Sequence, residues 1–376
     1  MIEIREAITD REMMDFVKFP FSLYKGNAYW VPPLIKDEFK SFNKNNDIFK
    51  SVTVQYFLAY KDGQIVGRIA GCINWIEVRE LQKSKVRFGW IDMIDDIEVT
   101  KALLKKVEEL GQQHQLSYIE GPMGFSNMDK AGMLTEGFDY IATMIGIYNM
   151  EYYPKHLEQL GYTTEAEWLE YKLDINTFNP DKINVMAGLV AKRYEVKLLE
   201  FKTIKELLPY VDEMFGLLNK TYANLQSFVP IQQFQIEHYK KKYLSFIHPE
   251  FISCVMDKNH KMIGFSITMP SFSKAFQKAN GSLFPFGFWH LLQAVKKNHH
   301  AEFYLIGIDP EYQNKGVNAL MFKEIYDHFT KRGITFIETN PLLVENNKIQ
   351  QLWKQFSPII HKRRKTFKKE LGNRKS

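Results

Sequence analysis

The sequence lacks several features that would decide its class at once. Only two cysteines, Cys72 and Cys254, occur among its 376 residues, which excludes a disulfide framework and a Cys-x-x-Cys metal site. No stretch approaches the roughly 18 consecutive apolar residues of a membrane span, and the charged start MIEIREAITDRE has no apolar run like that of a signal peptide. We therefore expect a cytoplasmic protein with no membrane span, whose two thiols are reduced and buried.

Positive charge is also scarce in most of the chain, although the net charge is +6. Residues 361–376 hold eight Lys or Arg and a single Glu, a net of +7, which leaves −1 for the other 360 residues. A neutral body gives no reason to expect DNA binding. We interpret the basic segment as a terminal strand and tail with solvated charges. The alternative is a tail that docks on RNA, a membrane surface or an acidic substrate.

What is present is one pattern that occurs twice. Residues 54–74 and 251–269 are each typical of a two-stranded hairpin, and these hairpins lie 197 positions apart. Each is followed by an apolar strand, a helical stretch, a short strand that ends in Ile-Glu, a second helix and a final strand. This is a mixed α/β order. We predict two tandem domains, residues 1–176 and 183–376, joined by a polar linker at 176–182.

The second half contains a loop that is suited to a phosphate. Residues 303–308 predict a strand, and apolar residues recur at helical spacing from Val317 to Phe329. The loop between them, DPEYQNKG, therefore lies at a helix N-terminus, where Gly316 would let an anion approach the free N–H groups. The chain has no G-x-x-x-x-G-K-[ST] and no G-x-G-x-x-G, which excludes the commoner nucleotide motifs. An ordinary helix-initiating turn is the alternative.

The segment IDPEYQNKGVNALMFKEIYDHFTKRG resembles the acyl-coenzyme A-binding motif of the GNAT superfamily of N-acetyltransferases. The motif is Gln or Arg, two residues, Gly, one residue, then Gly or Ala; Gln313, Gly316 and Asn318 stand at those positions, and Asn318 departs from the pattern. The chain resembles a tandem-domain bacterial branch over nearly its full length. That resemblance implies two GNAT-like domains and a site for acetyl-coenzyme A (acetyl-CoA) or another acyl-CoA. The residues expected to bind it are Ile308, Gln313, Asn314, Lys315, Gly316, Val317, Asn318, Ala319 and Asn346.

The resemblance also implies a mechanism and one departure from it. In the family an amine attacks the thioester carbonyl directly, and a Tyr on the last helix often protonates the departing thiolate. Trp353 stands at the matching place here, and Leu157 does so in the first half. The first half also has Asp95 and Asp96, without a Gly, where the second half has its loop. We therefore expect one coenzyme site, in the second half, and a degenerate first domain.

An acceptor pocket is expected from the segment EGPMGFSNMDKAGMLTEGFD, residues 120–139. Its glycines and polar residues favour a shaped loop between the domains, where a desolvated carboxylate could deprotonate an amine. The alternative is that these residues cap helices and satisfy the loop backbone. We find no His, Cys and acidic residues at the spacing of a metal site, so no metal is expected. The candidate catalytic residues are Glu120, Asn127, Asp129 and Tyr148.

The leading hypothesis is an N-acyltransferase that acts on a small-molecule or peptide amine. One alternative is a FemABX-like transferase that uses charged tRNA, for which the basic tail would suit RNA while the neutral body argues against it. Another is a non-catalytic acyl-CoA-binding protein, which Asn318 and Trp353 favour. The aromatic segment at residues 272–301 is predicted to be core or domain interface, with a substrate lid and a membrane-contacting helix as alternatives.

Overall fold

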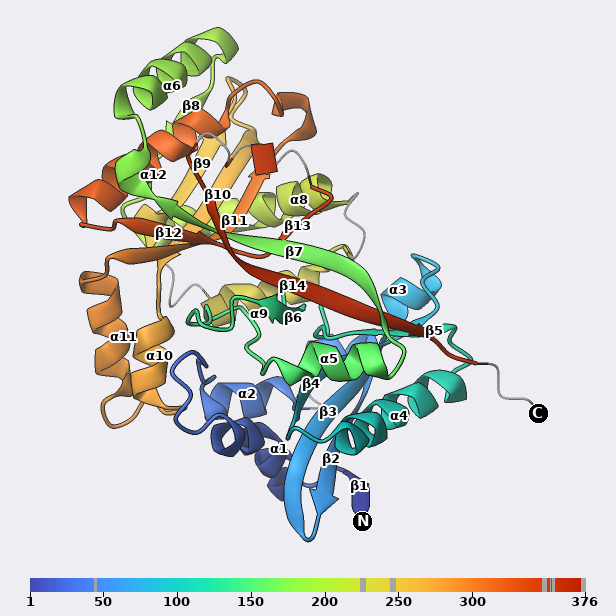
Figure 1. Cartoon of the computed structure of the whole chain (residues 1–376). Coiled ribbons are helices and arrows are strands. Elements are labelled where there is room, and N and C mark those ends of the chain that lie inside the picture. Colours follow the sequence, from blue (N-terminus) through green and yellow to red (C-terminus); the bar gives the residue numbers. More distant parts are fainter. Residues whose placement is uncertain are drawn as a thin grey trace.

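One mixed sheet runs through both halves of the chain in the computed structural model (Figure 1). The structure describes residues 1–43, 46–126, 128–223, 228–243, 248–346, 350–351, 353 and 356–372. The strands pair in the order β1-β2-β3-β4-β5-β14-β7-β12-β11-β10-β9-β8, while β6 pairs with β14 and β13 with β7. The strands are β1 (Ile2–Glu6), β2 (Val52–Lys61), β3 (Gln64–Asn74), β4 (Lys85–Met93), β5 (Tyr118–Gly121), β6 (Met133–Glu136), β7 (Thr163–Asp174), β8 (Lys197–Leu199), β9 (Ile252–Met256), β10 (Met262–Pro270), β11 (His300–Ile308), β12 (Phe336–Thr339), β13 (Leu342–Leu343) and β14 (Ile359–Glu370).

Helices of different lengths surround this sheet. The α-helices are α1 (Asp10–Leu23), α2 (Ile35–Ser41), α3 (Trp75–Arg79), α4 (Ile97–Gln113), α5 (Tyr152–Gln159), α6 (Pro180–Tyr194), α7 (Ile204–Leu207), α8 (Val211–Tyr222), α9 (Gln233–Tyr243), α10 (Ser273–Ala279), α11 (Gly287–Lys296) and α12 (Asn318–Lys331). The short 3-10 helices are η1 (Asp47–Lys50), η2 (Ile175–Thr177), η3 (Leu208–Tyr210), η4 (Pro249–Phe251) and η5 (Pro310–Tyr312).

The two halves repeat the same order of elements, as the sequence predicts. Strands β2 and β3 form the first hairpin, and β9 and β10 form the second. Each hairpin is followed by a strand, a long helix and a parallel strand, namely β4, α4 and β5 in the first half and β11, α12 and β12 in the second. A parallel pair needs such a crossover connection. The predicted mixed α/β fold class is confirmed.

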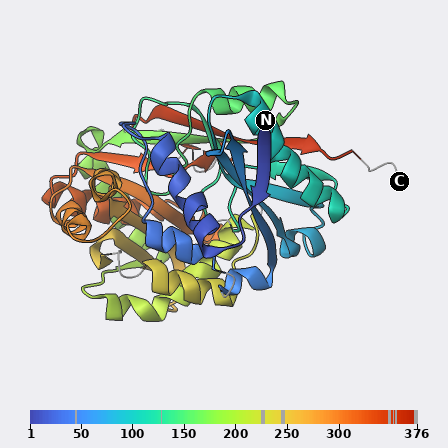
Figure 2. The ribbon, with the colours of Figure 1, turned by 90° about the horizontal axis from the view of Figure 1, so that it is seen from below.

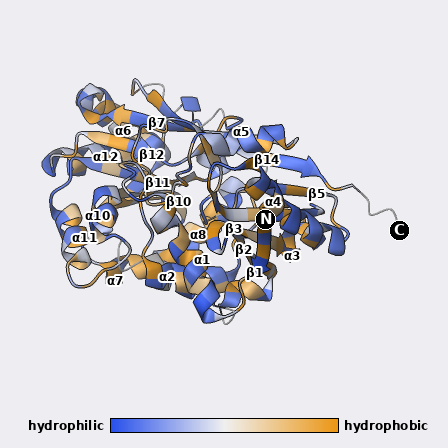
Figure 3. Cartoon of the chain, turned by 60° about the horizontal axis from the view of Figure 1, so that its bottom comes forward, coloured by the Kyte–Doolittle hydropathy of each residue, from blue (hydrophilic) through white to orange (hydrophobic). Residues whose placement is uncertain are grey.

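Amphipathic helices build the core of each half. The buried residues of α4 recur every three or four positions, at Val99, Leu103, Val107 and Leu110. Gly71 on β3 permits the close packing of this helix, because a Cβ there would lie only 3.1 Å from the side chain of Leu110. Helix α12 packs into the equivalent core of the second half. Figure 3 shows both hydrophobic residues, in orange, and hydrophilic residues, in blue, along the helices around the sheet.

A further apolar cluster joins the two halves. In it, Tyr24, Leu134 and Tyr148 of the first half pack with Phe272 and Phe276 of the second half. The first helix of the segment at 272–301, which is α10, therefore lies at the interface between the halves, in agreement with the leading prediction for that segment.

The last strand of each half pairs with strands of the other half. Strand β7 pairs with β12 and β13, whereas β14 pairs with β5 and β6, and the two long strands also pair with each other. Figures 1 and 2 show β14, in dark red, running lengthwise from the second half toward the first. The division at residues 176–183 stays a prediction, but the sheet of neither half is complete without a strand from beyond that point.

The charges of β14 are not all solvated, which corrects the prediction for the basic segment. Lys362 and Arg364 are each 1% exposed, because β14 is an interior strand with neighbours on both sides. The Arg364 guanidinium donates to the carboxylate of Glu170 on β7, and Lys362 donates to that of Glu338 on β12. Adjacent residues alternate between the two faces of a strand, and the Arg363 side chain between them is partly exposed, beside the exposed Glu136. The sequence pattern indicated the strand but not its burial.

A third carboxylate, that of Glu302, lies beside this cluster, and nearby positive charge compensates its burial less fully. Glu302 of β11 is directly opposite Glu338 of β12 in the parallel register, and its side chain is buried. Burial, followed by the negative charge of Glu338, raises the pKa of Glu302 to about 7. By contrast, burial would also raise the pKa of Glu338, but Lys362 and His361 hold it below its ordinary value. Below about pH 7, Glu302 is therefore mostly protonated while the facing Glu338 stays ionised.

Two neighbouring arginines of β14 give a matched test of the buried ion pairs. Arg364→Met should lower the free energy of unfolding by roughly 3–5 kcal/mol, because it leaves the Glu170 charge buried with less compensation. Arg363→Met should lower it by about 1 kcal/mol or less, since its pair with Glu136 is solvated. Urea unfolding followed by circular dichroism measures both. Equal losses in the two variants would contradict the assigned burial.

Glu302 should make stability depend on pH. Its folded-state pKa of about 7 lies above the ordinary value of 4.5, so folding favours the protonated form. That contribution is complete below about pH 4.5 and is lost as the pH rises to about 7. Relative to Glu302→Gln, the wild type should therefore lose up to about 3 kcal/mol of stability between pH 5 and pH 8. Urea midpoints measured across this range test it, and a constant difference between the two proteins would refute it.

Candidate active site

The loop between β11 and α12 is held at its first residue by a buried carboxylate. Asp309 is 1% exposed and accepts hydrogen bonds from the Glu311 backbone N–H at 3.1 Å and from Lys220 Nζ at 2.8 Å. Burial alone would raise the pKa of Asp309, but the hydrogen bonds from Lys220 and Glu311 keep it below its ordinary value. The Gln313 side chain donates to the carbonyl of Ile308 at 3.1 Å. These contacts set the path of the loop.

The end of the loop requires a glycine. Asn314 and Gly316 have φ angles of 60° and 79°, a region that glycine adopts without strain. A Cβ on Gly316 would also lie 3.1 Å from the side chain of Val190 on α6. Helix α12 begins at Asn318, and no side chain of the described residues caps its N-terminus. Its first N–H groups therefore form a place where an anion is stabilised.

The equivalent place in the first half is filled by the chain itself. Asp96 caps α4 by accepting from the Glu98 N–H at 3.0 Å, so a carboxylate already lies where an anion would bind. The gap between β4 and the segment that follows β5 is also closed, because the Met123 N–H donates to the Phe88 carbonyl at 2.9 Å. A Cβ on Gly89 would lie only 2.4 Å from the Met123 carbonyl oxygen. This contrast favours a coenzyme site in the second half.

The start of α12 borders a cavity of about 1620 Å³ that both halves line. The pairing of β11 with β12 ends at Phe303 and Thr339, and beyond it the residues that follow on both segments line the cavity. The volume exceeds the roughly 300–1,000 Å³ of common ligand pockets, so there is room for two substrates. The second half contributes, among others, residues 303–308, Gln313, Asn314, Gly316, Asn318, residues 339–343, Asn346 and Trp353. The first half contributes, among others, Trp30, Glu38, Arg68, Trp90, Asp92, residues 122–126, residues 128–131 and Tyr148.

The structure brings most of the predicted coenzyme-binding residues to this cavity and places three elsewhere. Lys315 extends its amine over the rings of Tyr312 and Tyr194, 4.9 Å and 5.5 Å from their centroids. Val317 and Ala319 are buried in the core against which α12 packs. Those that line the cavity are Ile308, Gln313, Asn314, Gly316, Asn318 and Asn346.

The predicted catalytic residues have three different outcomes. Asp129 and Tyr148 line the cavity. Asn127 lies outside the described residues. Glu120 is 4% exposed and accepts a hydrogen bond from Lys85 at 2.8 Å, within a buried cluster of charges that includes Glu77. The structure therefore gives Glu120 a role in packing rather than in the cavity, and sequence patterns did not reveal its partner because Lys85 lies 35 positions away.

Asp129 is the carboxylate of the predicted loop that faces the cavity. Its Oδ2 accepts from the Ser126 N–H at 2.8 Å and from the Ser126 hydroxyl at 3.1 Å. The Tyr148 hydroxyl donates to the carbonyl of Phe138 at 3.1 Å and accepts from Asn27 at 3.3 Å. Burial raises the pKa of Tyr148, so its hydroxyl stays protonated at neutral pH. Asp129 is thus a candidate base at the cavity, and Tyr148 is a neutral polar group there whose hydroxyl proton is engaged by Phe138.

Sequence reasoning missed a second polar group at this cavity. Arg68 and Asp92 both line it, and Arg68 Nε donates to Asp92 Oδ2 at 2.8 Å. The other oxygen of Asp92 accepts from the Tyr24 hydroxyl at 2.8 Å. These residues come from α1, β3 and β4, and no local motif unites them. The one available signal was a charged residue, Arg68, within the apolar strand IVGRIAG.

Trp353, which stands at the position of the family's Tyr, is part of the core. It is 1% exposed and packs edge-on against Phe303 and Phe322, with ring centroids 5.0 Å and 5.4 Å away. Its counterpart in the first half, Leu157, is also fully buried. The indole N–H of Trp353 makes no hydrogen bond with the described residues. A tryptophan has no hydroxyl group, so Trp353, although it also lines the cavity, has no hydroxyl proton to give to a departing thiolate.

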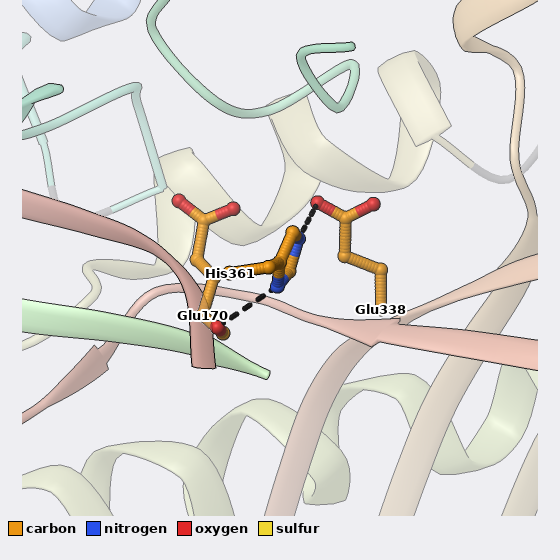
Figure 4. Close-up of side chains that lie close together, drawn as sticks. All are labelled: Glu170, Glu338 and His361. Atoms are coloured by element: carbon orange, nitrogen blue, oxygen red, sulfur yellow. Dashed lines mark hydrogen bonds and ion pairs between the residues drawn. The ribbon is translucent and has the colours of Figure 1, made fainter. Parts of the chain in front are cut away.

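Three side chains where β7, β12 and β14 meet lie close enough to hold a cation. The candidate ligand atoms of Glu170, Glu338 and His361 lie within 4.8 Å of one another (Figure 4). In Figure 4 the His361 ring lies between the two residues, bonded to the Glu338 carboxylate at 2.9 Å and to the Glu170 backbone carbonyl at 3.0 Å. Lys362 and Arg364 already bring two positive charges to these carboxylates. We interpret the cluster as an ion-pair network, because those charges oppose a further cation.

Comparisons with known proteins extend over nearly the whole chain. No protein-family model matches it. Protein YghO of Escherichia coli (strain K12) is 26% identical over 377 residues, which cover 98% of this chain and 95% of that protein. A bacterial ceramide synthase of Caulobacter vibrioides (strain NA1000 / CB15N) is 22% identical over 377 residues, with 96% of each chain covered. Among the described residues, no helix has the length and apolar character needed to cross a membrane.

Solved structures show what this architecture is. A tandem GNAT protein from the clavulanic acid biosynthesis pathway matches with a TM-score of 0.59 at 10% identity, over 99% of both chains. A GCN5-related N-acetyltransferase from Sphaerobacter thermophilus matches with a TM-score of 0.53 at 8% identity, over 98% of this chain and 96% of that one. Identities this low establish a shared fold rather than a shared substrate. The chain thus has the fold of tandem GNAT acetyltransferases, as the resemblance of its Gln-x-x-Gly loop implied.

Proposed function

We propose that the protein is an N-acyltransferase that moves an acyl group from acyl-CoA to an amine. The observation that carries this proposal is the single cavity that extends from the uncapped start of α12 to the polar residues of the first half. A donor and an acceptor bound at its two ends would meet in one enclosure. The GNAT fold of the neighbouring structures supports the same chemistry.

The donor would bind at the second-half end of the cavity. Its pyrophosphate suits the N–H groups around Gly316 and Asn318, because the helix dipole favours an anion there. The remaining arm of the coenzyme would follow the residues after Phe303 and Thr339, which line the cavity where the strand pairing has ended. Acetyl-CoA or a longer acyl-CoA would serve as co-substrate, and a coenzyme of this kind is consistent with a place in the cytoplasm.

The chemistry is a direct transfer. The amine nitrogen forms a bond to the thioester carbonyl carbon, the C–S bond breaks, and the ammonium proton leaves the nucleophile. Asp129 is the proposed acceptor of that proton, and the Tyr148 hydroxyl would orient the substrate. Because Trp353 has no hydroxyl group, water would protonate the thiolate of coenzyme A. The products are an amide and free coenzyme A.

The acceptor is proposed to be a long-chain amine, with other small-molecule or peptide amines as the alternative. The Caulobacter relative is named a ceramide synthase, and a ceramide is an amide of a long-chain amino alcohol. Apolar side chains such as Met128, Phe228, Phe234 and Phe276 line the cavity together with its polar groups. A hydrocarbon chain would be stabilised by that apolar surface.

The structure weakens the main argument for the tRNA-dependent alternative. That argument rested on a solvated basic tail, but Lys362 and Arg364 are buried in β14. Other cations of the strand are paired with acidic residues; Lys365 lies 3.0 Å from Glu167. The non-catalytic alternative predicts coenzyme binding without turnover, and the two experiments that follow separate it from the enzyme.

Acetyl-CoA binding tests the coenzyme site. Gly316 is a poor target because any side chain would be strained at its φ of 79°. Lys315→Glu instead places a negative charge beside the proposed pyrophosphate site and should weaken binding about tenfold or more by repulsion. Lys331→Glu makes the same charge change at the other end of α12, roughly 20 Å away, and should leave the affinity unchanged. Calorimetric titration measures both. Absence of binding to the wild type would remove the proposal.

Release of free coenzyme A tests the transfer. A panel of short and long-chain amines is offered with acetyl-CoA and longer acyl-CoA species, and free thiol is followed with a thiol-reactive dye. Asp129→Asn should lower kcat by about 100-fold or more while acetyl-CoA still binds, because the base is lost. Glu136→Gln, at the end of β6 in the same segment and paired with Arg363, serves as the control. Coenzyme binding without thiol release for any amine would establish the binding-protein alternative.

A further inference from the structure

Five large apolar side chains project from the turn before α11 and from its first two turns. Phe284, Phe286, Phe288, Trp289 and Leu292 are 75%, 71%, 43%, 54% and 51% exposed. We call these five residues the aromatic surface. Figure 1 places α11 at an outer edge of the molecule, beside α10. Exposed apolar clusters of this size mark sites of interaction with a partner or a membrane.

The aromatic surface is held firmly by the rest of its segment. Leu291 of α11 is buried in the same apolar cluster as Phe272 and Phe276 of α10. The Gln277 side chain of α10 donates to the carbonyls of Ala28 and Trp30, both at 2.9 Å, and so ties the helix pair to the first half. The exposed side chains are therefore presented by anchored helices rather than by a loose loop.

The segment that carries the aromatic surface contains basic residues but no acidic ones. Residues 271–301 contain four lysines and three histidines but no Asp or Glu, although the chain has 44 acidic residues. The four lysines, Lys274, Lys278, Lys296 and Lys297, are all exposed. Aromatic side chains enter the interface of a bilayer, while lysines are attracted to anionic headgroups. The combination complements an anionic membrane in both apolarity and charge.

We propose that the aromatic surface docks the protein on an anionic phospholipid membrane. A symmetric contact between two copies would oppose this segment, which has four exposed lysines and no acidic residue, with itself, and like charges would repel. A protein partner would need pockets that fit the projecting aromatic side chains. A bilayer accepts side chains such as Phe284 and Phe286 without a complementary shape. The protein would lie on the membrane surface through α11.

Docking would also bring the cavity close to the membrane. Phe276 of α10 lines the cavity and packs in the same cluster as Leu291 of α11, so a single helix separates the aromatic surface from the enclosed space. The inference goes beyond the proposed acyl transfer and does not depend on it, because membrane binding is measured without acyl-CoA.

Vesicle flotation with the full chain tests the proposal. The protein should float with vesicles of phosphatidylcholine and phosphatidylglycerol in a 3:1 ratio, and binding should fall about tenfold or more on vesicles of phosphatidylcholine alone or in high salt. The variant Phe284→Ser, Phe286→Ser, Trp289→Ser should lose binding by about tenfold or more, and Lys296→Glu, Lys297→Glu should lose the preference for anionic vesicles. The control Val185→Ser, Leu189→Ser changes residues that are 63% and 61% exposed on α6 and should bind as the wild type does.

Three results would overturn the proposal. The first is a wild type that floats with neither kind of vesicle. The second is an equal loss of vesicle binding in the α6 control, which would show that the binding is not specific to α11. The third is a wild-type dimer, seen by light scattering, that the triple Ser variant dissociates, because the surface would then be an interface between copies. A circular dichroism spectrum and a urea midpoint equal to those of the wild type confirm the fold of the triple variant and keep this test independent of acyl transfer.

Discussion

The ion pairs buried between β14 and its neighbours are the constraint on which the rest of the structure depends. Arg364 and Lys362 pay a large desolvation cost that only nearby carboxylates offset. Those carboxylates, Glu170 and Glu338, come from β7 and β12. The carbonyls of Ile141 and Ile147 accept further hydrogen bonds from the two cations. The pair of Arg364 with Glu170 joins the two halves, so both must assemble before these two charges are satisfied.

The same ion pairs also fix the positions of the two ends of the cavity relative to each other. Strands β7 and β14 cross from one half to the other, and the cavity is lined by both halves next to them. Trp168 of β7 lines the cavity and pairs in register with both Leu343 of β13 and Arg364 of β14. In the proposed function, the centre of the sheet would therefore hold the donor end and the acceptor end of the cavity at a fixed separation. Reactive groups held in this way lose less entropy when they meet.

The elements that sequence patterns predicted are those that local chemistry determines. Both hairpins and the strand–loop–helix around Gly316 follow from short-range periodicity and turn residues, and all are present. Lys362 and Arg364 of β14 were assigned to solvent wrongly, because their burial depends on strands far away in the sequence. Glu120 was assigned to a pocket for the same reason, since its partner Lys85 lies on a different strand. Likewise, Arg68 and Asp92 meet only after β3 and β4 have paired.

The exchange of terminal strands has a consequence for synthesis of the chain on the ribosome. The edge of β5 is covered by β14, which follows it by about 240 residues. The first half therefore emerges and waits with an open sheet edge until nearly the whole chain has been translated. Contacts so distant in sequence form slowly, and an uncovered edge invites pairing with other chains. The two halves therefore complete their folding together, although each has the order of elements of a separate domain.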